Sequence, residues 1–486
     1  MKSYLKGGKK WKTIWKKSIG LITAICMVVG IVIGSGVFFK AQNILKLTEG
    51  NMPLGILAWI IGGAIMIVCA YSFSILAEKY NNVNGLVDYA EATCGKKYGY
   101  KIGWYLTTIY TPCITSVLAW VSARYTLVIF GMQDPTTATC LSLSFLYLIL
   151  SYVINVLSPI IAGKIQVSTT VMKLIPIGLM AVVGTIYGLI VKDAGSSSSI
   201  LVSNFSTIGN GNISALFGAV VATAFAYEGW ILATTINSEL KDAKKNLPKA
   251  LVIGTLIIII AYIAYYIGVA GGASVDSLIN DGATVAFKNI FGVVGGTILN
   301  VLIAISCLGT LNGLMVSCTR NMYSLAVRNE GPKPEVFKQV DASTNMPTNS
   351  AILGLLLSGI WLFYFYIANL TPVLIRNYDV ERANWLIKLL GTISAETNTY
   401  AVGWFAFDSS ELPIVALYAL YIPIFLRITK MKELSVVKRI VLPVLSIIGS
   451  IFMIIAAIYA HKWGVVYFLI ITIIAMVIGK KCYREE

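Results

Sequence analysis

The chain has 486 residues, of which 57% are hydrophobic and only 12% carry a charged side chain. Soluble domains contain about 25% charged residues, so this composition excludes an ordinary soluble enzyme. The formal net charge is +16, and because a basic surface is also typical of nucleic-acid binding, the location of that charge has to be established. Composition alone therefore indicates a polytopic membrane protein.

Twelve apolar segments divide the chain, and a transmembrane helix needs about 20 such residues to cross the hydrocarbon core. In chain order they cover approximately 18–39, 53–77, 102–131, 138–160, 165–191, 213–238, 250–271, 286–327, 350–370, 405–426, 439–460 and 464–479. The eighth segment is too long for one crossing, so part of it is expected to be a surface or loop segment. We predict an all-α polytopic membrane protein with twelve transmembrane helices.

Lysine and arginine residues indicate on which side of the membrane each connection lies, because cytoplasmic loops are enriched in them. With the N-terminus inside, the inner segments hold 28 of the 38 basic residues and the outer loops hold 8, among them Lys40. The remaining two, Arg124 and Lys173, lie within spans. The basic residues are thus topology signals, and no nucleic-acid partner is expected. Both the basic N-terminus (1–17) and the tail (480–486) are predicted to be cytoplasmic.

Residues suited to metal or covalent chemistry are scarce. The chain has one histidine, His461, and its eight cysteines include no CxxC pair, so the sequence predicts no metal site, no cofactor and no disulfide framework. A membrane-embedded enzyme would need metal-ligand spacing or paired intramembrane carboxylates. A channel would need rings of like-charged or carbonyl-bearing repeats. Because the sequence shows neither pattern, both classes are disfavoured.

Two spans contain glycine-rich interruptions near their middle. The first span carries Gly30-Ile-Val-Ile-Gly-Ser-Gly-Val-Phe, and the sixth carries Phe225-Ala-Tyr-Glu-Gly-Trp. Small residues in a membrane helix often serve only close helix packing. Two breaks at matching depth, five spans apart, instead favour an inverted repeat whose broken helices face each other. The predicted repeats cover 18–191 and 213–426, followed by two helices over 439–479, with a long outer link at about 371–404.

A pair of such breaks has a definite chemical preference. A helix that stops at Ser35 and restarts presents free backbone N–H groups, which favour an anion such as a carboxylate. Unwound carbonyls around Phe225 and Tyr227, at the C-terminal end of a half-helix, favour a cation such as an ammonium group. An amino acid is the simplest ligand that carries both charges on adjacent atoms.

Ionisable residues deep in a membrane are costly and usually functional. Among the acidic residues only Glu228 lies deep in a span, and among the basic ones only Lys173 does, whereas Arg124 stands toward the outer end of its span and is expected to snorkel. Two interpretations of Glu228 remain open. It is either a buried carboxyl that stays protonated or pairs with Lys173, or a group that contacts the substrate or carries a proton.

Three segments resemble the amino-acid–polyamine–organocation superfamily, and within it the L-type amino-acid transporter-like exchangers. The first two are the interrupted spans, the second of which runs on into the charged loop Ser238-Glu-Leu-Lys-Asp-Ala-Lys-Lys-Asn-Leu-Pro. The third is Ser306-Cys-Leu-Gly-Thr-Leu-Asn-Gly. The span pattern covers almost the whole chain, while these motifs cover less than a fifth of it.

The resemblance implies twelve helices in a five-plus-five inverted repeat, alternating access, and specific roles for the residues of the motifs. Lys173 is expected to replace the sodium ion that related transporters bind between helices 1, 5 and 8, with Ser306 as its hydroxyl partner, so that sodium-independent exchange is the expected mode. Phe225 is expected to cover the bound substrate. The implied substrate-binding residues are Ile33, Gly34, Ser35, Gly36, Val37, Phe225, Ala226, Tyr227, Glu228 and Gly229.

Neither the substrate nor the coupling follows from these motifs. A carboxylate at Glu228 near the substrate side chain would select cationic amino acids, whereas a neutralised one would leave a pocket for small neutral amino acids. Proton-coupled symport and polyamine or amine antiport remain as alternatives, and so does a nutrient-sensing receptor. We expect a bacterial inner-membrane protein that works without an obligatory accessory subunit, while the 371–404 link is interpreted as either an outer lid or a partner surface.

Overall fold

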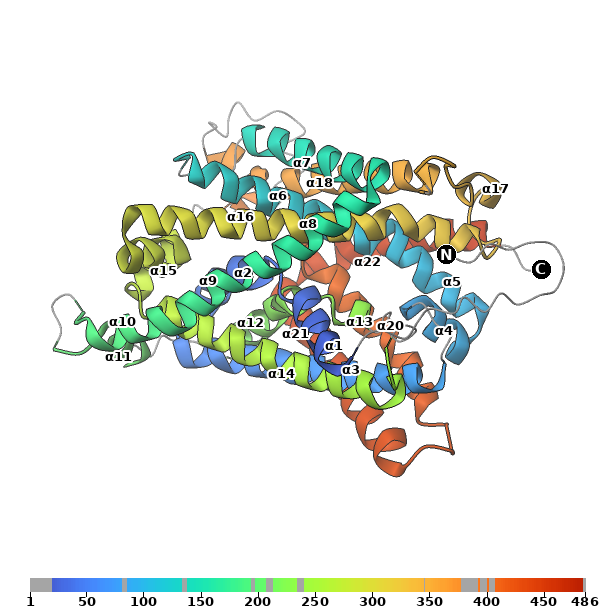
Figure 1. Cartoon of the computed structure of the whole chain (residues 1–486), viewed down its shortest axis with the longest axis horizontal. Helices are drawn as coiled ribbons and strands as arrows, with labels where there is room; N and C mark the ends of the chain where they lie inside the picture. Colours follow the sequence, from blue (N-terminus) through green and yellow to red (C-terminus); the bar gives the residue numbers. More distant parts are fainter. Residues whose placement is uncertain are drawn as a thin grey trace.

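The computed structural model describes residues 20–80, 85–132, 138–193, 197–206, 213–233, 240–344, 346–376, 392–393, 400–401 and 407–483. Almost all of these residues are helical (Figure 1). Two short strands, β1 (Thr392–Ile393) and β2 (Tyr400–Ala401), pair antiparallel with Thr392 opposite Ala401. They belong to the link predicted at 371–404, most of which lies outside the described residues, so its role as lid or partner surface stays a prediction.

The helices follow one another with few interruptions. They are α1 (Leu21–Val32), α2 (Gly36–Leu47), α3 (Met52–Lys79), α4 (Leu86–Cys94), α5 (Lys96–Tyr105), η1 (Leu106–Tyr110), α6 (Thr111–Ile129), α7 (Ala138–Leu157), α8 (Pro159–Met172), α9 (Leu174–Leu179), η2 (Met180–Gly184), α10 (Thr185–Ile190), α11 (Ile200–Ser206), α12 (Ile213–Ala226), α13 (Trp230–Ala233), α14 (Ala243–Ala270), α15 (Val275–Asp281), α16 (Ala283–Ala326), α17 (Pro334–Phe337), α18 (Thr348–Arg376), α20 (Leu412–Ile428), η5 (Val437–Val441), α21 (Leu442–His461) and α22 (Trp463–Cys482). The elements η1, η2 and η5 are single π-helical turns.

Every predicted span corresponds to a helical segment. Nine segments of the described chain are long and apolar enough to cross a membrane, and three shorter apolar helices, Leu21–Gly30, Ile213–Ala226 and Leu412–Ile428, occupy the positions of predicted spans one, six and ten. These three are short because helices one and six are interrupted and helix ten begins late, at Leu412. The prediction of twelve membrane helices is confirmed.

Local sequence sets where individual helices begin and bend. The Asn51 side chain accepts a hydrogen bond of 3.0 Å from the Leu54 N–H at the start of α3, which satisfies one of the unpaired N–H groups there. In α16, Gly292 has φ +72° and ψ 176°, a conformation that L side chains rarely adopt, and the helix is kinked at this point. The first nine residues of α16 therefore form a separate short helix, where the excess length of the eighth span had suggested a surface or loop segment.

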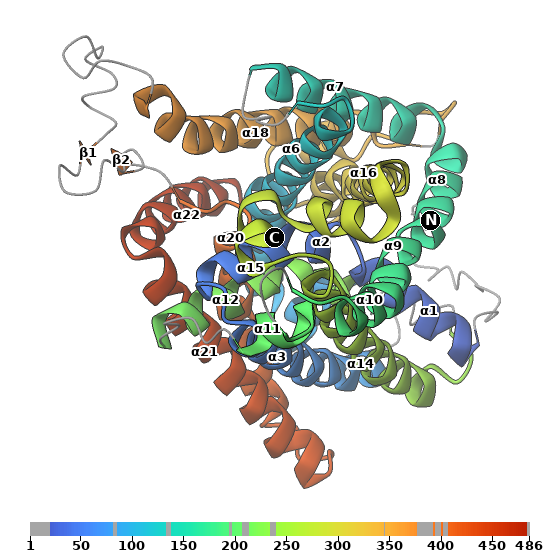
Figure 2. The same ribbon diagram turned by 90° about the vertical axis from the view of Figure 1, so that its left-hand side faces the viewer.

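The long helices run roughly side by side, and α16 extends along the longest axis of the molecule (Figure 1). It packs against α6, α8 and α18, while α14 packs against α1 and α3. An end-on view places α7 and α18 at one edge of the bundle and α21 at another (Figure 2). The outermost helices expose apolar side chains, such as Ile473 and Ile474 of α22, which is expected of surfaces that face lipid tails.

The first outer loop begins later than predicted, because Lys40 and Lys46, both assigned to it, lie within α2. Lys40 was assigned to an outer loop, but helix α2 continues through it to Leu47, and only 1% of Lys40 is exposed. The predicted first span ended too early because Lys40 and Gln42 lower the local hydropathy, although the helix buries part of their face against the bundle.

Candidate functional site

The two predicted helix breaks exist and touch each other at the centre of the bundle. Between α1 and α2 the chain is non-helical at residues 33–35, and between α12 and α13 it turns at residues 227–229, with φ +106° at Gly229. A Cβ atom added to Gly36 would lie 2.5 Å from the Cα of Ala226. The absence of a side chain at Gly36 is thus what allows the start of α2 to approach the end of α12.

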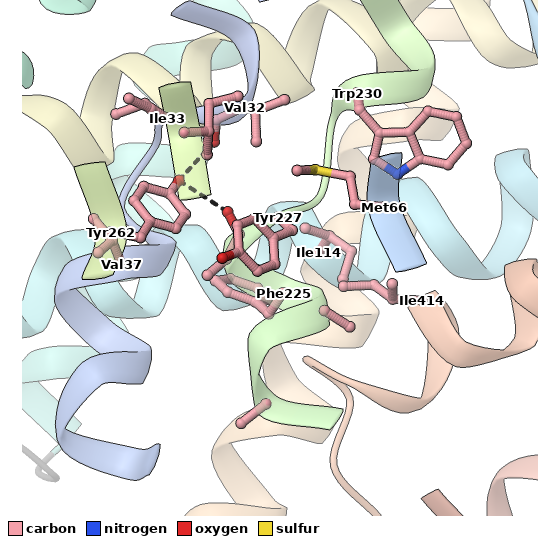
Figure 3. Packing of buried hydrophobic residues seen from close by; sticks show 14 of the residues in the cluster. Val32, Ile33, Val37, Met66, Ile114, Phe225, Tyr227, Trp230, Tyr262 and Ile414 are labelled. Carbon is pink, nitrogen blue, oxygen red and sulfur yellow. Dashed lines mark hydrogen bonds between the residues drawn. The ribbon is translucent and has the colours of Figure 1, made fainter. Parts of the chain in front are cut away.

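Aromatic residues from neighbouring helices hold both breaks in place. The Tyr262 hydroxyl of α14 lies 3.0 Å from the Ala226 carbonyl oxygen and 3.3 Å from that of Val32, so it can donate to the end of either broken helix (Figure 3). Tyr227 stacks on Tyr262 with 5.3 Å between ring centroids, and its hydroxyl donates to the Trp59 carbonyl at 2.9 Å. The Tyr262 contacts satisfy carbonyls that helix termination leaves unpaired, and the Tyr227 contact attaches the break to α3.

The start of α2 provides the anion-binding end of the site. Ser35 precedes the helix, and its carbonyl accepts hydrogen bonds of 3.1 Å from the N–H groups of both Phe38 and Phe39. The N–H groups of Gly36 and Val37 belong to the first turn and have no partner within the helix. The Ser35 hydroxyl is buried and has no hydrogen-bond partner in the part of the chain that the structure describes. An anion placed here would meet several free donors and the positive end of the helix dipole.

The end of α12 supplies carbonyl groups and an aromatic cover. The Glu228 N–H reaches the Phe225 carbonyl at 3.4 Å, a long hydrogen bond that leaves this oxygen weakly paired. The Phe225 ring is buried and meets Phe39 edge-on, with 6.1 Å between centroids. Figure 3 shows Phe225, Tyr227 and Ile33 grouped around the break. An ammonium group at this helix end would face partial negative charge.

Glu228 lies within the break in helix six and is partly exposed. The hydroxyl of Tyr110, on the π-helical turn η1, donates to its Oε1 atom, and the Gly229 N–H also donates to the carboxylate. The structure contains no ion pair between Glu228 and Lys173 in its described part. The predicted pairing with Lys173 is wrong, because each of the two groups has a different partner, whereas a protonated carboxyl and a role in substrate or proton binding both stay predictions.

Lys173 instead joins helix five to the broken first helix. Its ammonium donates to the Gly30 carbonyl oxygen at 2.5 Å, and only 3% of the residue is exposed. The helices approach closely here, since a Cβ at Gly30 would meet Thr170 at 2.6 Å. The Ser306 hydroxyl is buried without a hydrogen-bond partner among the described residues, so the expected Lys173–Ser306 contact is not present in this conformation.

Sequence reasoning missed three contributors to this region. Tyr110 and Tyr262 gave no signal, because tyrosines are frequent in this chain and neither stands in a motif. Lys40 forms an ion pair with Glu411, 371 residues away, with 2.5 Å between Nζ and Oε1. A usable signal existed for this pair, since opposite charges stand next to span ends on the same predicted side of the membrane. No group of three or more metal-ligating side chains occurs within the described ranges.

One family model and three known transporters are similar to this chain in sequence. The family model of the amino acid permeases matches residues 19–479. The serine/threonine exchanger SteT of Bacillus subtilis is 30% identical over 335 residues, covering 68% of this chain and 73% of SteT. The large neutral amino acids transporter small subunit 2 of Rattus norvegicus and the human Asc-type amino acid transporter 1 are each 26% identical, covering 68% of this chain and 62% and 63% of their own lengths.

A solved structure shows that the fold is shared more widely. The crystal structure of MhsT in complex with L-phenylalanine aligns with a TM-score of 0.55 at 15% identity, covering 93% of this chain and all of that one. The family match extends over nearly the whole chain and includes both broken helices. The chain belongs to the amino acid permease family and is a multi-pass membrane transporter of amino acids rather than an enzyme.

Proposed function

We propose that this protein exchanges amino acids across the bacterial inner membrane by alternating access and without sodium. The observation that carries the proposal is the contact between the N-terminal end of α2 and the C-terminal end of α12 at Gly36 and Ala226. An α-carboxylate would bind the backbone N–H groups on one side, and an α-ammonium would bind the carbonyls on the other. The proposed substrate-binding residues are Ile33, Gly34, Ser35, Gly36, Val37, Phe225, Ala226, Tyr227, Glu228 and Gly229.

Lys173 supports independence from sodium. Its ammonium already places a positive charge against the Gly30 carbonyl, between helix five and the broken first helix. Because this cation is attached to the chain, it occupies its position in each transport cycle without a sodium gradient, and it links helix five to the broken first helix. The unpaired Ser306 hydroxyl is a candidate partner for Lys173 in another conformation of the cycle.

For the substrate we propose small neutral amino acids first. SteT is named a serine/threonine exchanger, and two further relatives carry names that refer to large neutral and Asc-type amino acids. Cationic amino acids are the second candidate, because the Glu228 side chain is partly exposed beside the break and an ionised carboxylate there would attract a positively charged side chain. Proton-coupled symport and amine antiport are the competing mechanisms.

Orientation follows from the charge asymmetry. We propose that both termini are cytoplasmic, and the excess of basic residues in the segments that would then face inward supports this orientation. Each membrane helix then has a defined direction, and the junction between α21 and α22 faces the outside. We also propose that the protein works without an obligatory accessory subunit.

Reconstituted protein tests the exchange mechanism. Labelled serine or arginine would be offered to proteoliposomes in sodium-free buffer, with and without unlabelled amino acid inside. Exchange predicts uptake that requires internal substrate. Uptake into empty liposomes that collapses without a proton gradient would establish symport instead, and transport of amines alone would overturn the proposal.

Two pairs of variants test the assigned residues. Glu228→Gln should remove any preference for arginine without abolishing serine exchange. Glu330 is a buried carboxyl far along the chain, so Glu330→Gln should leave substrate selectivity unchanged. Lys173→Met should lower exchange more than about tenfold, because it leaves a buried carbonyl without its charged donor. The exposed Lys164→Met on the same helical segment is the matched control. Selectivity that is unchanged in Glu228→Gln would exclude Glu228 from the pocket.

A further inference from the structure

A buried cluster of charged groups lies beside the cover of the substrate site. We name the residues Lys40, Glu411 and His461 the latch. Lys40 Nζ lies 2.5 Å from Glu411 Oε1, and His461 Nε2 lies 3.0 Å from Glu411 Oε2. Ser410 extends the cluster, because its hydroxyl lies 2.8 Å from Lys40 Nζ and donates to Asp408 Oδ1 at 2.5 Å.

The latch connects elements that are far apart in the sequence. Lys40 belongs to α2, Glu411 is the residue before α20, and His461 ends α21. Backbone N–H groups of Ser410 and Glu411 donate to Asp408 Oδ1 at 2.7 and 3.0 Å, which fixes the chain where α20 begins. The latch therefore ties the second half of the broken first helix to helices ten and eleven.

The same lysine touches the aromatic cover of the substrate site. Lys40 Nζ lies 5.2 Å from the ring centroid of Phe225 and 5.3 Å from that of Phe39, both within the range of cation–π attraction. Movement of α2 away from α20 would break the ion pair and shift the ammonium from Phe225 at the same time. Opening of the site on this side is thus coupled to breaking the latch.

Burial makes the ion pair of the latch a weak source of net stability. The Lys40 and Glu411 side chains are 1% and 3% exposed. A buried ion pair gains little over apolar packing because desolvation offsets its attraction, whereas removing one partner is strongly destabilising. His461 differs from the other two members, since 17% of its side chain is exposed, so it can exchange a proton with water.

The charge balance gives the direction of a pH effect. The groups that face His461 are Glu411 and Asp408, which are acidic, and Lys40, which is basic; Lys462 follows it in the chain. With a neutral imidazole the two carboxylates outnumber the one ammonium by one charge. Protonation of His461 balances the cluster and adds a second ion pair to Glu411, which strengthens the closed arrangement.

We propose that the latch is a pH-sensitive outer gate, in which protonation of His461 from the outside holds the substrate site closed and slows exchange. The proposal rests on the exchange function and orientation proposed above. Because histidine is the side chain that ordinarily changes its charge between about pH 5 and 8, external acidification within that range would engage the gate. The gate would reduce traffic through the transporter in acid surroundings.

Right-side-out membrane vesicles with an internal pH of about 7 test the proposal. Serine exchange should fall about fivefold or more between external pH values of about 7.5 and 5.5 in the unmodified protein. His461→Gln keeps a neutral hydrogen-bond donor to Glu411 and should remove this dependence while retaining activity at about pH 7.5. The exposed Lys462→Gln changes a neighbouring charge outside the latch and should retain the dependence. An equal acid response in His461→Gln, or no response in the unmodified protein, would overturn the proposal.

A second measurement does not depend on transport. Cys113 of α6 is buried, and its thiol donates to the Ser409 carbonyl at 3.1 Å, directly beside the latch. In a variant that keeps only this cysteine, a membrane-impermeant maleimide added outside should label Cys113 several-fold faster in His461→Gln than in the parent at about pH 5.5, and equally fast at about pH 7.5. Equal labelling rates of the two proteins at both pH values would refute the gate, even if the protein transports another substrate. Labelling rates that differ at about pH 5.5 in a protein that does not exchange serine would refute only the proposed function.

Discussion

Gly36 is the position at which a single methyl group should have the largest effect on substrate binding. A Cβ at residue 36 would lie 2.5 Å from the Ala226 Cα and 3.2 Å from both its Cβ and its backbone nitrogen. Carbon atoms in contact are separated by about 3.5–4.0 Å, so Gly36→Ala must move the start of α2 from the end of α12 by about 1 Å or more. The obstacle is backbone, which cannot rotate away as a side chain would.

The displacement acts on both ends of the bound amino acid. A ligand hydrogen-bonded to both helix ends at about 2.9 Å cannot keep both contacts when the ends separate by about 1 Å, because hydrogen bonds fail beyond about 3.5 Å. Loss of one hydrogen bond to a charged group costs about 1.5–3 kcal/mol. The apparent affinity for substrate should therefore fall about 10- to 150-fold in Gly36→Ala.

Counterflow and equilibrium binding of labelled serine would measure this effect. Gly178→Ala on α9 is the control, since a Cβ there meets no atom within 4 Å and should leave affinity unchanged. Thermal unfolding in detergent would establish that both variants are folded. An affinity of folded Gly36→Ala within about twofold of the unmodified protein would refute the assignment of the helix ends as the binding site.

Two further predictions concern groups that support the site or the fold. Tyr262→Phe removes the hydroxyl that caps Ala226 and should reduce exchange about 5- to 150-fold. Tyr265→Phe is the control and should not reduce exchange, because the Tyr265 hydroxyl has no hydrogen-bond partner among the described residues. Equal activities of the two variants would contradict the role of the cap. Beyond the end of α16, burial raises the pKa of Glu330 to about 7. The free energy of unfolding therefore falls as the pH rises from the ordinary pKa of a glutamate toward 7, because the buried carboxyl must then ionise. Glu330→Gln should therefore raise the unfolding temperature at about pH 8, by the equivalent of about 1 kcal/mol after allowance for solvent screening. The gain at about pH 5 should be small. A gain that does not depend on pH would refute this prediction.

Local features of the sequence were enough to predict the membrane helices and their interruptions. Hydropathy over about 20 residues and the conformational freedom of glycine are properties of short segments, so the breaks at residues 33–35 and 227–229 and the excess length of the eighth span could be anticipated, but not the kink at Gly292 itself. Lys173 could be singled out because a charged side chain within an apolar span is energetically costly unless it has a polar partner. Only the structure identified that partner, the Gly30 carbonyl oxygen.

The same local reasoning misassigned Lys40. A hydropathy window averages over all faces of a helix, so a polar residue near a span end shortens the predicted span even when its own face is buried. Whether Lys40 faces lipid, water or protein depends on which helices surround α2. That information is absent from the 20 residues around it.

By itself, the sequence determined the number and order of the membrane helices and the positions of both breaks, and it predicted that those breaks bind a ligand with adjacent opposite charges. Only the tertiary structure decided that Glu228 pairs with Tyr110 rather than Lys173, and that Lys40, Glu411 and His461 form one cluster. Tyr110 and Glu228 are 118 residues apart in the sequence, and Lys40 and Glu411 are 371 residues apart. The physical reason is that helix formation and membrane insertion depend on neighbours in the chain, whereas the partner of a buried charge depends on how the whole bundle packs.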